Sequence, residues 1–109
     1  MYKVDGNSIM LTRGDSFYAE VGIYDAEGQA YEVQSGDVIK FGLKHSTKES
    51  TCLIKKTIDN NDLILYLSPE DTKELPFGNY VYDIEITFAN GDVDTFINGA
   101  SFQLKAEVV

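Results

Sequence analysis

The sequence contains no tryptophan, one cysteine, one histidine and two prolines among its 109 residues. Because Cys52 is the only cysteine, no disulfide can form within the chain. One cysteine and one histidine also cannot supply the set of thiolate and imidazole ligands that a structural zinc site needs. These scarcities predict a protein that is made in a reducing compartment and folds without a disulfide, metal or cofactor.

Basic residues are scarce as well: nine lysines and arginines stand against eighteen aspartates and glutamates, for a net charge of −9. Such a charge repels the phosphates of nucleic acids and the anionic surfaces of membranes. The chain also lacks a basic and then apolar leader, and it has no run of about 18 apolar residues. We therefore expect no nucleic-acid partner, no membrane partner, and synthesis in the cytoplasm without a signal peptide.

The residues that are present are typical of one globular domain. Hydrophobic residues make up 43% and charged residues 25% of the chain, as in globular proteins, and the length suits a single core over residues 1–109. Apolar and polar residues alternate with a period of two in several segments, which indicates strands with one buried face. The expected strands cover residues 7–11, 17–24, 30–33, 39–43, 52–58, 63–67, 80–88 and 93–97.

Short strands of this spacing, without a long helix, predict the fold class. We expect an all-β fold, a two-sheet antiparallel immunoglobulin-like β-sandwich of about seven or eight strands, with the segment 7–11 at a sheet edge. Ser68 and Pro69, followed by two acids, predict one short helical turn near residues 69–73. We expect residues 1–109 to form a single domain.

Turn residues separate the strands. Residues 25–28 predict a chain reversal, because Gly28 can adopt a positive φ. Asn90 and Gly91 are the strongest hairpin signal and predict a type I′ turn, whose two central residues both need a positive φ. Asn98-Gly99-Ala100 interrupts the last strand, and a bulge there would place Phe96 and Phe102 on different faces.

Tyrosines are the most specific candidates for contacts. A turn that precedes Tyr80 and Tyr82 resembles the tyrosine corner of immunoglobulin-like sandwiches, in which a phenol hydroxyl caps a backbone group. Either tyrosine fits that structural role. Tyr18, Tyr24 and Tyr66 lie on the faces opposite the core residues of their strands. Exposed aromatic side chains in such places either form an interface or cover the sheet, and we expect these three to form an interface with another subunit.

Two loop motifs are better explained as turns than as binding sites. Residues 59–62, with the sequence Asp-Asn-Asn-Asp, offer oxygen ligands but lack the glycine and the distal glutamate of a calcium-binding loop. Arg13-Gly14-Asp15 matches a tripeptide that adhesion receptors bind, but it lies where the chain needs a turn. Both motifs are therefore expected to be structural.

Candidate catalytic groups are few. Asp83 and Glu85, with Asp94 opposite, are expected to be exposed acids that protect a sheet edge rather than a pair for hydrolysis. Cys52 is expected to be a buried strand residue rather than a nucleophile activated by His45. We expect no enzyme activity, because no nucleophile, base and orienting group come together in the sequence.

A resemblance extends over nearly the whole chain. The segments that carry it are Leu11-Thr12-Arg13-Gly14-Asp15, Asp25-Ala26-Glu27-Gly28, residues 36–41, residues 67–72 and residues 75–83. In this order they resemble small proteins encoded by phages and prophages of Gram-positive bacteria. More loosely, they are similar to the amino-terminal immunoglobulin-like domain of upper baseplate proteins.

The resemblance implies a virion structural or adaptor protein, made in the bacterial cytoplasm and incorporated into a baseplate or tail. Its partners would be other phage structural proteins, with further copies of the chain in a homo-oligomer as one option. The alternative is a β-sandwich carbohydrate-binding module. Sugar-binding platforms commonly stack aromatic rings on the sugar, and without tryptophan only tyrosine could serve, which favours the first hypothesis.

Overall fold

The computed structural model describes residues 2–24 and 27–106. It contains eight strands and one short helix, in agreement with the predicted strand number and helical turn. The elements are β1 (Tyr2–Asp5), β2 (Ser8–Thr12), β3 (Phe17–Glu20), β4 (Val38–Lys44), β5 (Ile54–Ile58), β6 (Ile64–Leu67), α1 (Pro69–Lys73), β7 (Gly78–Thr87) and β8 (Val93–Lys105).

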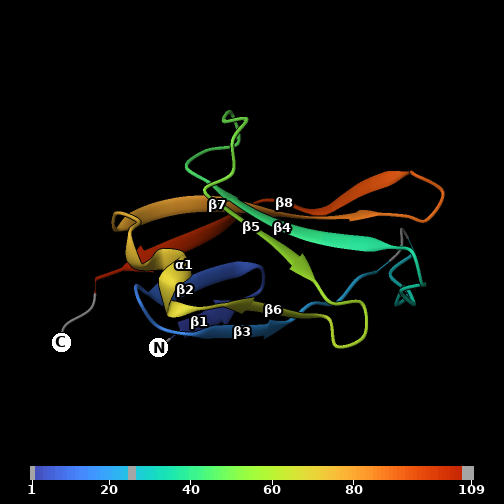
Figure 1. Cartoon of the computed structure of the whole chain (residues 1–109), viewed down its shortest axis with the longest axis horizontal. Helices are drawn as coiled ribbons and strands as arrows, with labels where there is room; N and C mark the ends of the chain where they lie inside the picture. Colours follow the sequence, from blue (N-terminus) through green and yellow to red (C-terminus); the bar gives the residue numbers. More distant parts are fainter. Residues whose placement is uncertain (1, 25–26, 107–109) are drawn as a thin grey trace.

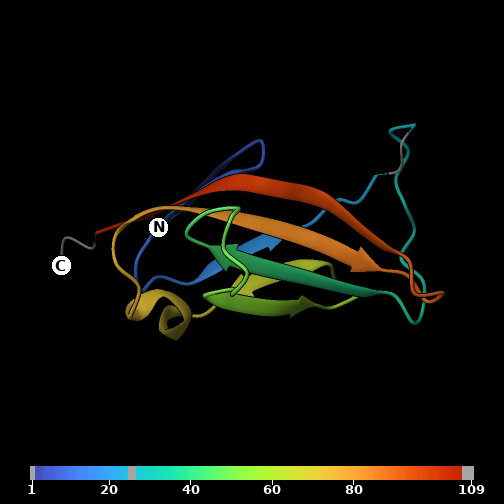
Figure 2. The same cartoon turned by 90° about the horizontal axis from the view of Figure 1, so that it is seen from above.

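The strands form two sheets that face each other (Figure 1). The large sheet has six strands in the order β1-β2-β8-β7-β4-β5, and the small sheet pairs β3 with β6. Figure 2 shows the large sheet from above, with the β1–β2 hairpin along one margin and β5 along the other. The prediction of an all-β, two-sheet sandwich is thus confirmed. One strand pair departs from an antiparallel arrangement, since β2 runs parallel to β8.

The core lies between the sheets because period-two alternation directs one face of each strand inward. In β4 the residues Ile39, Phe41 and Leu43 are buried, while Lys40 points out. The same alternation runs along β7 and buries its two tyrosines. The core residues are Ile9, Leu11, Phe17, Val21, Ile23, Ile39, Phe41, Leu43, Ile54, Ile58, Leu65, Leu67, Tyr80, Tyr82, Ile84, Ile86, Phe102 and Leu104.

Three expectations about strand placement are wrong. Cys52 is only partly buried and precedes β5, whereas it was expected to be a buried strand residue. The segment 7–11 forms β2, which lies one position in from the edge, and the edge strand is β1. Every residue of β1 is exposed, so it has no alternation of burial that a pattern could reveal. Residues 30–33 form no strand; they contribute one isolated bridge, between Ala30 and Tyr24.

The hairpin between β7 and β8 forms as predicted, but its turn is not of type I′. Gly91 has a φ of +96°, whereas Asn90 does not adopt a positive φ. Gly91 N–H donates to Phe88 O at 2.8 Å, and Phe88 N–H donates to Asp92 O at 2.7 Å. These bonds close a three-residue loop in which glycine supplies the single left-handed position. Of the turn expected at residues 25–28, the first two residues lie outside the described part, and Gly28 has a φ of +79°.

The predicted bulge in β8 is present. Tyr82 is opposite Ala100 and Ile84 is opposite Ile97, so Asp83 alone faces two residues of β8. The Asp83 carboxylate accepts a hydrogen bond from Gly99 N–H at 2.6 Å, which satisfies a backbone donor of the bulge. A second register shift follows between Ile84 and Glu85. Phe102 lies in the core and Phe96 is partly buried against the same core, so the expected placement of these two rings on different faces is wrong.

Helix α1 connects β6 of the small sheet to β7 of the large sheet. Ser68 N–H donates to the Asp71 carboxylate at 2.8 Å, as in a capping box. Asp71 also forms an ion pair of 2.8 Å with Lys56 of β5. Burial opposes ionisation of Asp71, but Lys56 and Ser68 outweigh it and lower the pKa of this carboxyl. In the described part of the chain no helix is long and apolar enough to cross a bilayer.

Candidate functional site

The outer surface of the small sheet carries an exposed aromatic pair. Phe17 and Ala19 of β3 face the core, so the intervening Tyr18 points outward. The strand register places Tyr18 directly opposite Tyr66 of β6, with ring centroids 4.7 Å apart and an interplanar angle of 35°. Ile64 extends the same surface and is also exposed. We call Tyr18, Ile64 and Tyr66 the aromatic face.

The structure brings together two of the three tyrosines that were predicted to form an interface. Tyr18 and Tyr66 are 55% and 40% exposed. Tyr24 is 62% exposed but lies beyond the end of β3, where its ring packs over Gly22. A Cβ at Gly22 would lie 3.0 Å from Tyr24 Cε2. Tyr24 therefore belongs to a different surface from the aromatic face.

Tyr80 and Tyr82 both donate their hydroxyl groups to backbone carbonyls. Tyr80 Oη donates to Pro76 O at 2.5 Å, four residues upstream, which is the local contact of a tyrosine corner. Tyr82 Oη donates to Asn7 O, in the loop between β1 and β2. Burial raises the pKa of Tyr82 to about 12. Burial also raises the pKa of Tyr80, and the positive charge of Arg13 opposes that rise.

Removing either hydroxyl is expected to destabilise the domain without changing its fold. Tyr80→Phe and Tyr82→Phe should each lower the free energy of unfolding by about 0.5–1.5 kcal/mol, the net worth of one hydrogen bond. Urea denaturation measures the effect. Tyr66→Phe is the matched control, because its exposed hydroxyl can bond to water in both states. Equal midpoints for all three variants and the wild type would contradict a structural role for these hydroxyls.

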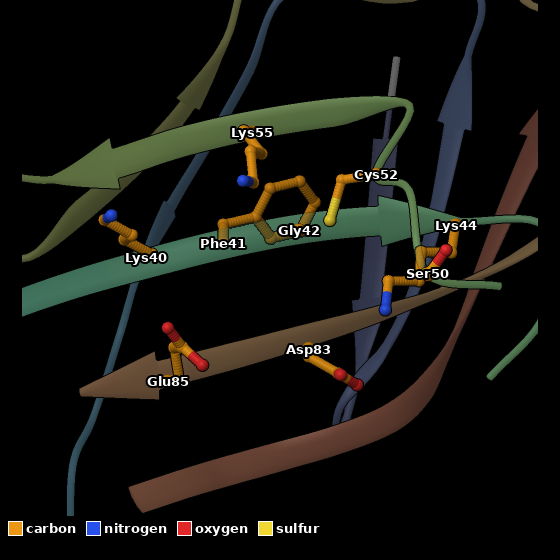
Figure 3. Close-up of a pocket in the computed structure, with 9 residues that line it drawn as sticks. All are labelled: Lys40, Phe41, Gly42, Lys44, Ser50, Cys52, Lys55, Asp83 and Glu85. Carbon is orange, nitrogen blue, oxygen red and sulfur yellow. The ribbon is translucent and has the colours of Figure 1, made fainter. Parts of the chain in front are cut away.

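The outer face of the large sheet contains a hollow of about 260 Å³ (Figure 3). Its floor is Gly42 of β4, and Cys52 reaches over that glycine (Figure 3), so that a Cβ there would lie 2.9 Å from Cys52 Sγ. Other residues line its sides. These are Lys40, Phe41, Lys44, Ser50, Lys55, Asp83 and Glu85. The register places Lys40 opposite Glu85, and Gly42 between Lys55 and Asp83. We call this site the lysine hollow.

The lysine hollow does not assemble a catalytic set. His45, the candidate base, is not among the lining residues; its ring stacks on Tyr80 with centroids 5.1 Å apart. Asp83 is engaged by the bulge of β8. Asp94 lies opposite Ile86, so it is not on the face that carries Asp83 and Glu85. In residues 2–24 and 27–106, no three potential metal-ligating side chains of His, Cys, Asp or Glu cluster together.

Charge is nevertheless distributed unevenly along the chain. Residues 40–56 contain five of the nine basic residues and one acid, so this segment carries +4 and the rest of the chain carries −13. The basic residues are Lys40, Lys44, Lys48, Lys55 and Lys56, and the acid is Glu49. Three of these lysines, Lys40, Lys44 and Lys55, line the hollow beside Asp83 and Glu85, whereas Lys56 is paired with Asp71 of α1.

Asp37 organises the loops at one end of the sandwich and was missed by the sequence analysis. It is only 4% exposed. Its carboxylate accepts hydrogen bonds from Tyr31 Oη at 2.6 Å, Gln34 N–H at 2.8 Å and Ala89 N–H at 3.1 Å. Asn60 Nδ2 donates to the Asp37 carbonyl at 2.6 Å. Asp37 therefore holds three separate loops together.

The Asp37 bonds also shift two pKa values. The hydrogen bond from Tyr31, followed by the bond from Gln34 N–H, holds the pKa of the Asp37 carboxyl below its usual value, although burial opposes this effect. The same hydrogen bond raises the pKa of Tyr31. The only sequence signal was an aspartate after glycine in a turn, which is too common to identify a structural centre.

The two loop motifs have structural partners. In the acidic loop, Asp59 Oδ1 accepts from Asn61 N–H at 2.7 Å and Asp62 Oδ1 accepts from Ile64 N–H at 3.0 Å, which are the bonds of Asx turns. This loop forms the turn that was expected.

The Arg13-Gly14-Asp15 turn packs against the helix and the loop after it. Arg13 Nη1 donates to Leu75 O at 3.1 Å, and the guanidinium lies 4.0 Å from the centre of the Phe77 ring. Gly14 N–H donates to Thr72 Oγ1 at 3.0 Å, and Thr72 is fully buried. The tripeptide therefore joins the start of the sheet to α1.

Comparison with known proteins leaves the family open. No family model matches this sequence, and no curated protein matches it. What is established is the all-β sandwich with its aromatic face, its lysine hollow and its loop centre at Asp37.

Proposed function

We propose that this chain is a non-enzymatic structural or adaptor domain of a phage or prophage particle, located in a baseplate or tail, which acts by protein–protein assembly. The order of turn motifs along the sequence resembles such proteins. The observation that carries the proposal is the aromatic face, because it offers an exposed contact surface that the fold itself does not use.

The aromatic face has the composition of a protein interface. Tyrosine buries a large area at low entropic cost and keeps a polar hydroxyl, and it is enriched in protein contacts. Tyr18 and Tyr66 support each other through their ring contact, so both rings are held on the surface before a partner binds. A prepared surface loses less entropy on association.

The alternative classes have less support. Catalysis needs a nucleophile, a base and an orienting group in contact, and the lysine hollow supplies Cys52 without a lining histidine. A carbohydrate-binding module needs an aromatic platform, and the two rings of the aromatic face are inclined by 35° to one another. Assembly requires only that a complementary surface covers the tyrosines.

Incorporation into particles tests the proposal. Particles are purified from an induced lysogen that carries the gene, and the chain is quantified by mass spectrometry. We expect the wild type in the particles, and the Tyr18→Ala/Tyr66→Ala variant at a level reduced at least about tenfold, as for loss of an interface centre. Tyr24→Ala is the matched control, since it removes a tyrosine from outside the aromatic face that is even more exposed than Tyr18 and Tyr66.

Two results would overturn the proposal. One is the absence of the wild-type chain from purified particles whose other structural proteins are detected. The other is binding on a glycan array that is lost in Tyr18→Ala, which would instead support the carbohydrate-binding alternative. Thermal melting of each variant establishes that a loss of incorporation does not come from unfolding.

A further inference from the structure

Strand β1 leaves one edge of the large sheet open. Its residues are all exposed, with Tyr2 at 43% and Val4 at 47%. It contains neither proline nor a bulge, two devices with which proteins protect sheet edges. The opposite edge, β5, is tied to α1 by the Lys56–Asp71 ion pair. Within the described chain, β1 is therefore the more accessible edge of this sheet.

Two residues of β1 direct their backbone N–H and C=O groups away from β2, toward the free edge of the sheet. Arg13, directly after β2, donates its N–H to Lys105 O of β8 at 2.9 Å. Backbone groups alternate in direction along a strand, so the odd-numbered residues of β2 bond to β8 and the even-numbered residues bond to β1. In the observed register, these even-numbered residues pair with Lys3 and Asp5. The backbone N–H and C=O groups of Tyr2 and Val4 consequently point to the free edge.

We infer that a second copy of this chain adds to β1 in an antiparallel arrangement, about a two-fold axis beside Val4. In that register Val4 of one copy faces Val4 of the other as a hydrogen-bonded pair. Lys3 then lies opposite Asp5 of the second copy, and Asp5 lies opposite its Lys3. The two six-stranded sheets become one continuous sheet.

Charge complementarity identifies the second copy as the occupant. Lys3 is the only basic residue among the first twelve, and it alternates with Asp5 on the same face of β1. A two-fold axis through Val4 converts this pair into two opposite-charge pairs at non-hydrogen-bonded positions, where side chains approach most closely. Away from β1, two copies of net charge −9 repel each other, so this locally neutral edge is a favourable point of contact.

The other face of β1 is apolar. Val4 borders a groove of about 250 Å³ between the β1–β2 hairpin and β3. Its apolar lining continues inward to the core through Ile9, Ala19 and Val21. A second copy's Val4, lying beside Val4 on the same face of the extended sheet, would cover the mouth of this groove. Hydrogen bonds, opposite charges and apolar burial thus favour one register.

The inference rests on the proposed function, since it names the partner at one contact of an assembling domain, but it uses a surface other than the aromatic face. Sedimentation equilibrium of the full chain at 0.15 M salt tests it. We expect a weak dimer at chain concentrations of roughly 0.1–1 mM, because the contact is small. Lys3→Glu and Asp5→Lys should each weaken dimerisation at least about tenfold by placing like charges opposite each other.

The double variant Lys3→Glu/Asp5→Lys is the decisive control. It restores opposite charges in the same register and keeps the net charge at −9, whereas the single variants have −11 and −7. We expect it to dimerise like the wild type. A wild type that stays monomeric up to about 1 mM, or a double variant that stays monomeric while the wild type dimerises, would overturn the inference.

A cross-link tests the register itself. In a Cys52→Ser background, Val4→Cys places one thiol opposite its own copy at a Cα separation of about 5.5 Å, which a disulfide can span. Mild oxidation should give a disulfide dimer at position 4, and none for Val93→Cys, which replaces a more exposed valine in β8. Equal cross-linking of both would contradict the register. A dimer abolished by Tyr18→Ala/Tyr66→Ala but not by the β1 variants would refute the β1 contact and leave the proposed function intact.

Discussion

Replacing Phe17 by alanine is expected to lower the free energy of unfolding by about 3–5 kcal/mol. Phe17 is fully buried, and its ring lies edge-on to Tyr2 with centroids 4.7 Å apart. It anchors β3, and therefore the small sheet, against the large one. Truncation removes the apolar burial and leaves a cavity that neighbouring side chains fill only in part. The loss is a large share of the roughly 5–15 kcal/mol that stabilises a typical domain.

Tyr18→Ala is the control for this result, because it changes the next residue of the same strand. Its ring points outward, so its removal should cost no more than about 0.5–1.5 kcal/mol, the value of its contact with Tyr66. Urea denaturation, followed by circular dichroism, gives both midpoints. If the two variants unfold at the same urea concentration, β3 does not present Phe17 to the core.

Replacing Asp37 by alanine is expected to destabilise the domain more than any other single change of an acidic residue. The carboxylate accepts three hydrogen bonds, two from the loop of residues 31–34 and one from Ala89 in the β7–β8 loop, and all three are lost when it is removed. Tyr31→Phe removes one of these bonds and should have a smaller effect. Asp94→Ala, at an exposed position of β8, should have almost none. Thermal melting at pH 7 ranks the three variants.

The same carboxylate should make stability depend on pH. Its pKa is lower in the folded chain than the value of about 3.9 in the unfolded one. Its contribution is therefore complete well above pH 4 and is lost as the pH falls through the folded pKa. We expect the wild type to lose stability between about pH 5 and pH 3 more steeply than Asp37→Asn. Parallel curves for the two proteins over this range would contradict the assignment.

The strands that could be predicted from the sequence are those whose alternation reflects burial. In β4 and β7 every second residue enters the core, so the pattern gave nearly the observed bounds. The alternation at residues 30–33 has a different cause. Tyr31 lies in a loop, where its ring packs on Phe88 and its hydroxyl donates a hydrogen bond to Asp37. Its partial burial therefore does not indicate pairing with another strand. Strand β1 has no buried residue, and only Gly6, with a φ of +59°, marks its turn into β2.

The contacts of the candidate site depend on strand register, which a single sequence does not reveal. That Tyr18 faces outward followed from its position beside Phe17. That it meets Tyr66 required knowing that β3 pairs with β6, although the two strands are far apart in the chain. Likewise, two of the donors to Asp37, Ala89 and Asn60, come from distant loops, and the hollow over Gly42 exists because Cys52 folds back on β4. Which side chains contact one another in the candidate site thus depends on pairing between segments that are distant in the sequence.

The parallel pairing of β2 with β8 has a consequence for the order in which the domain folds. Ile9 is opposite Phe102, so the amino-terminal hairpin joins the sheet through a strand near the other end of the chain. The β7–β8 hairpin, by contrast, closes through a short loop and can form early, because loop closure is less costly between nearby residues. During synthesis the hairpin of β1 and β2 emerges from the ribosome before β8, the strand with which β2 pairs. Its edge is then unpaired on both sides, and at that stage the chain is most vulnerable to aggregation.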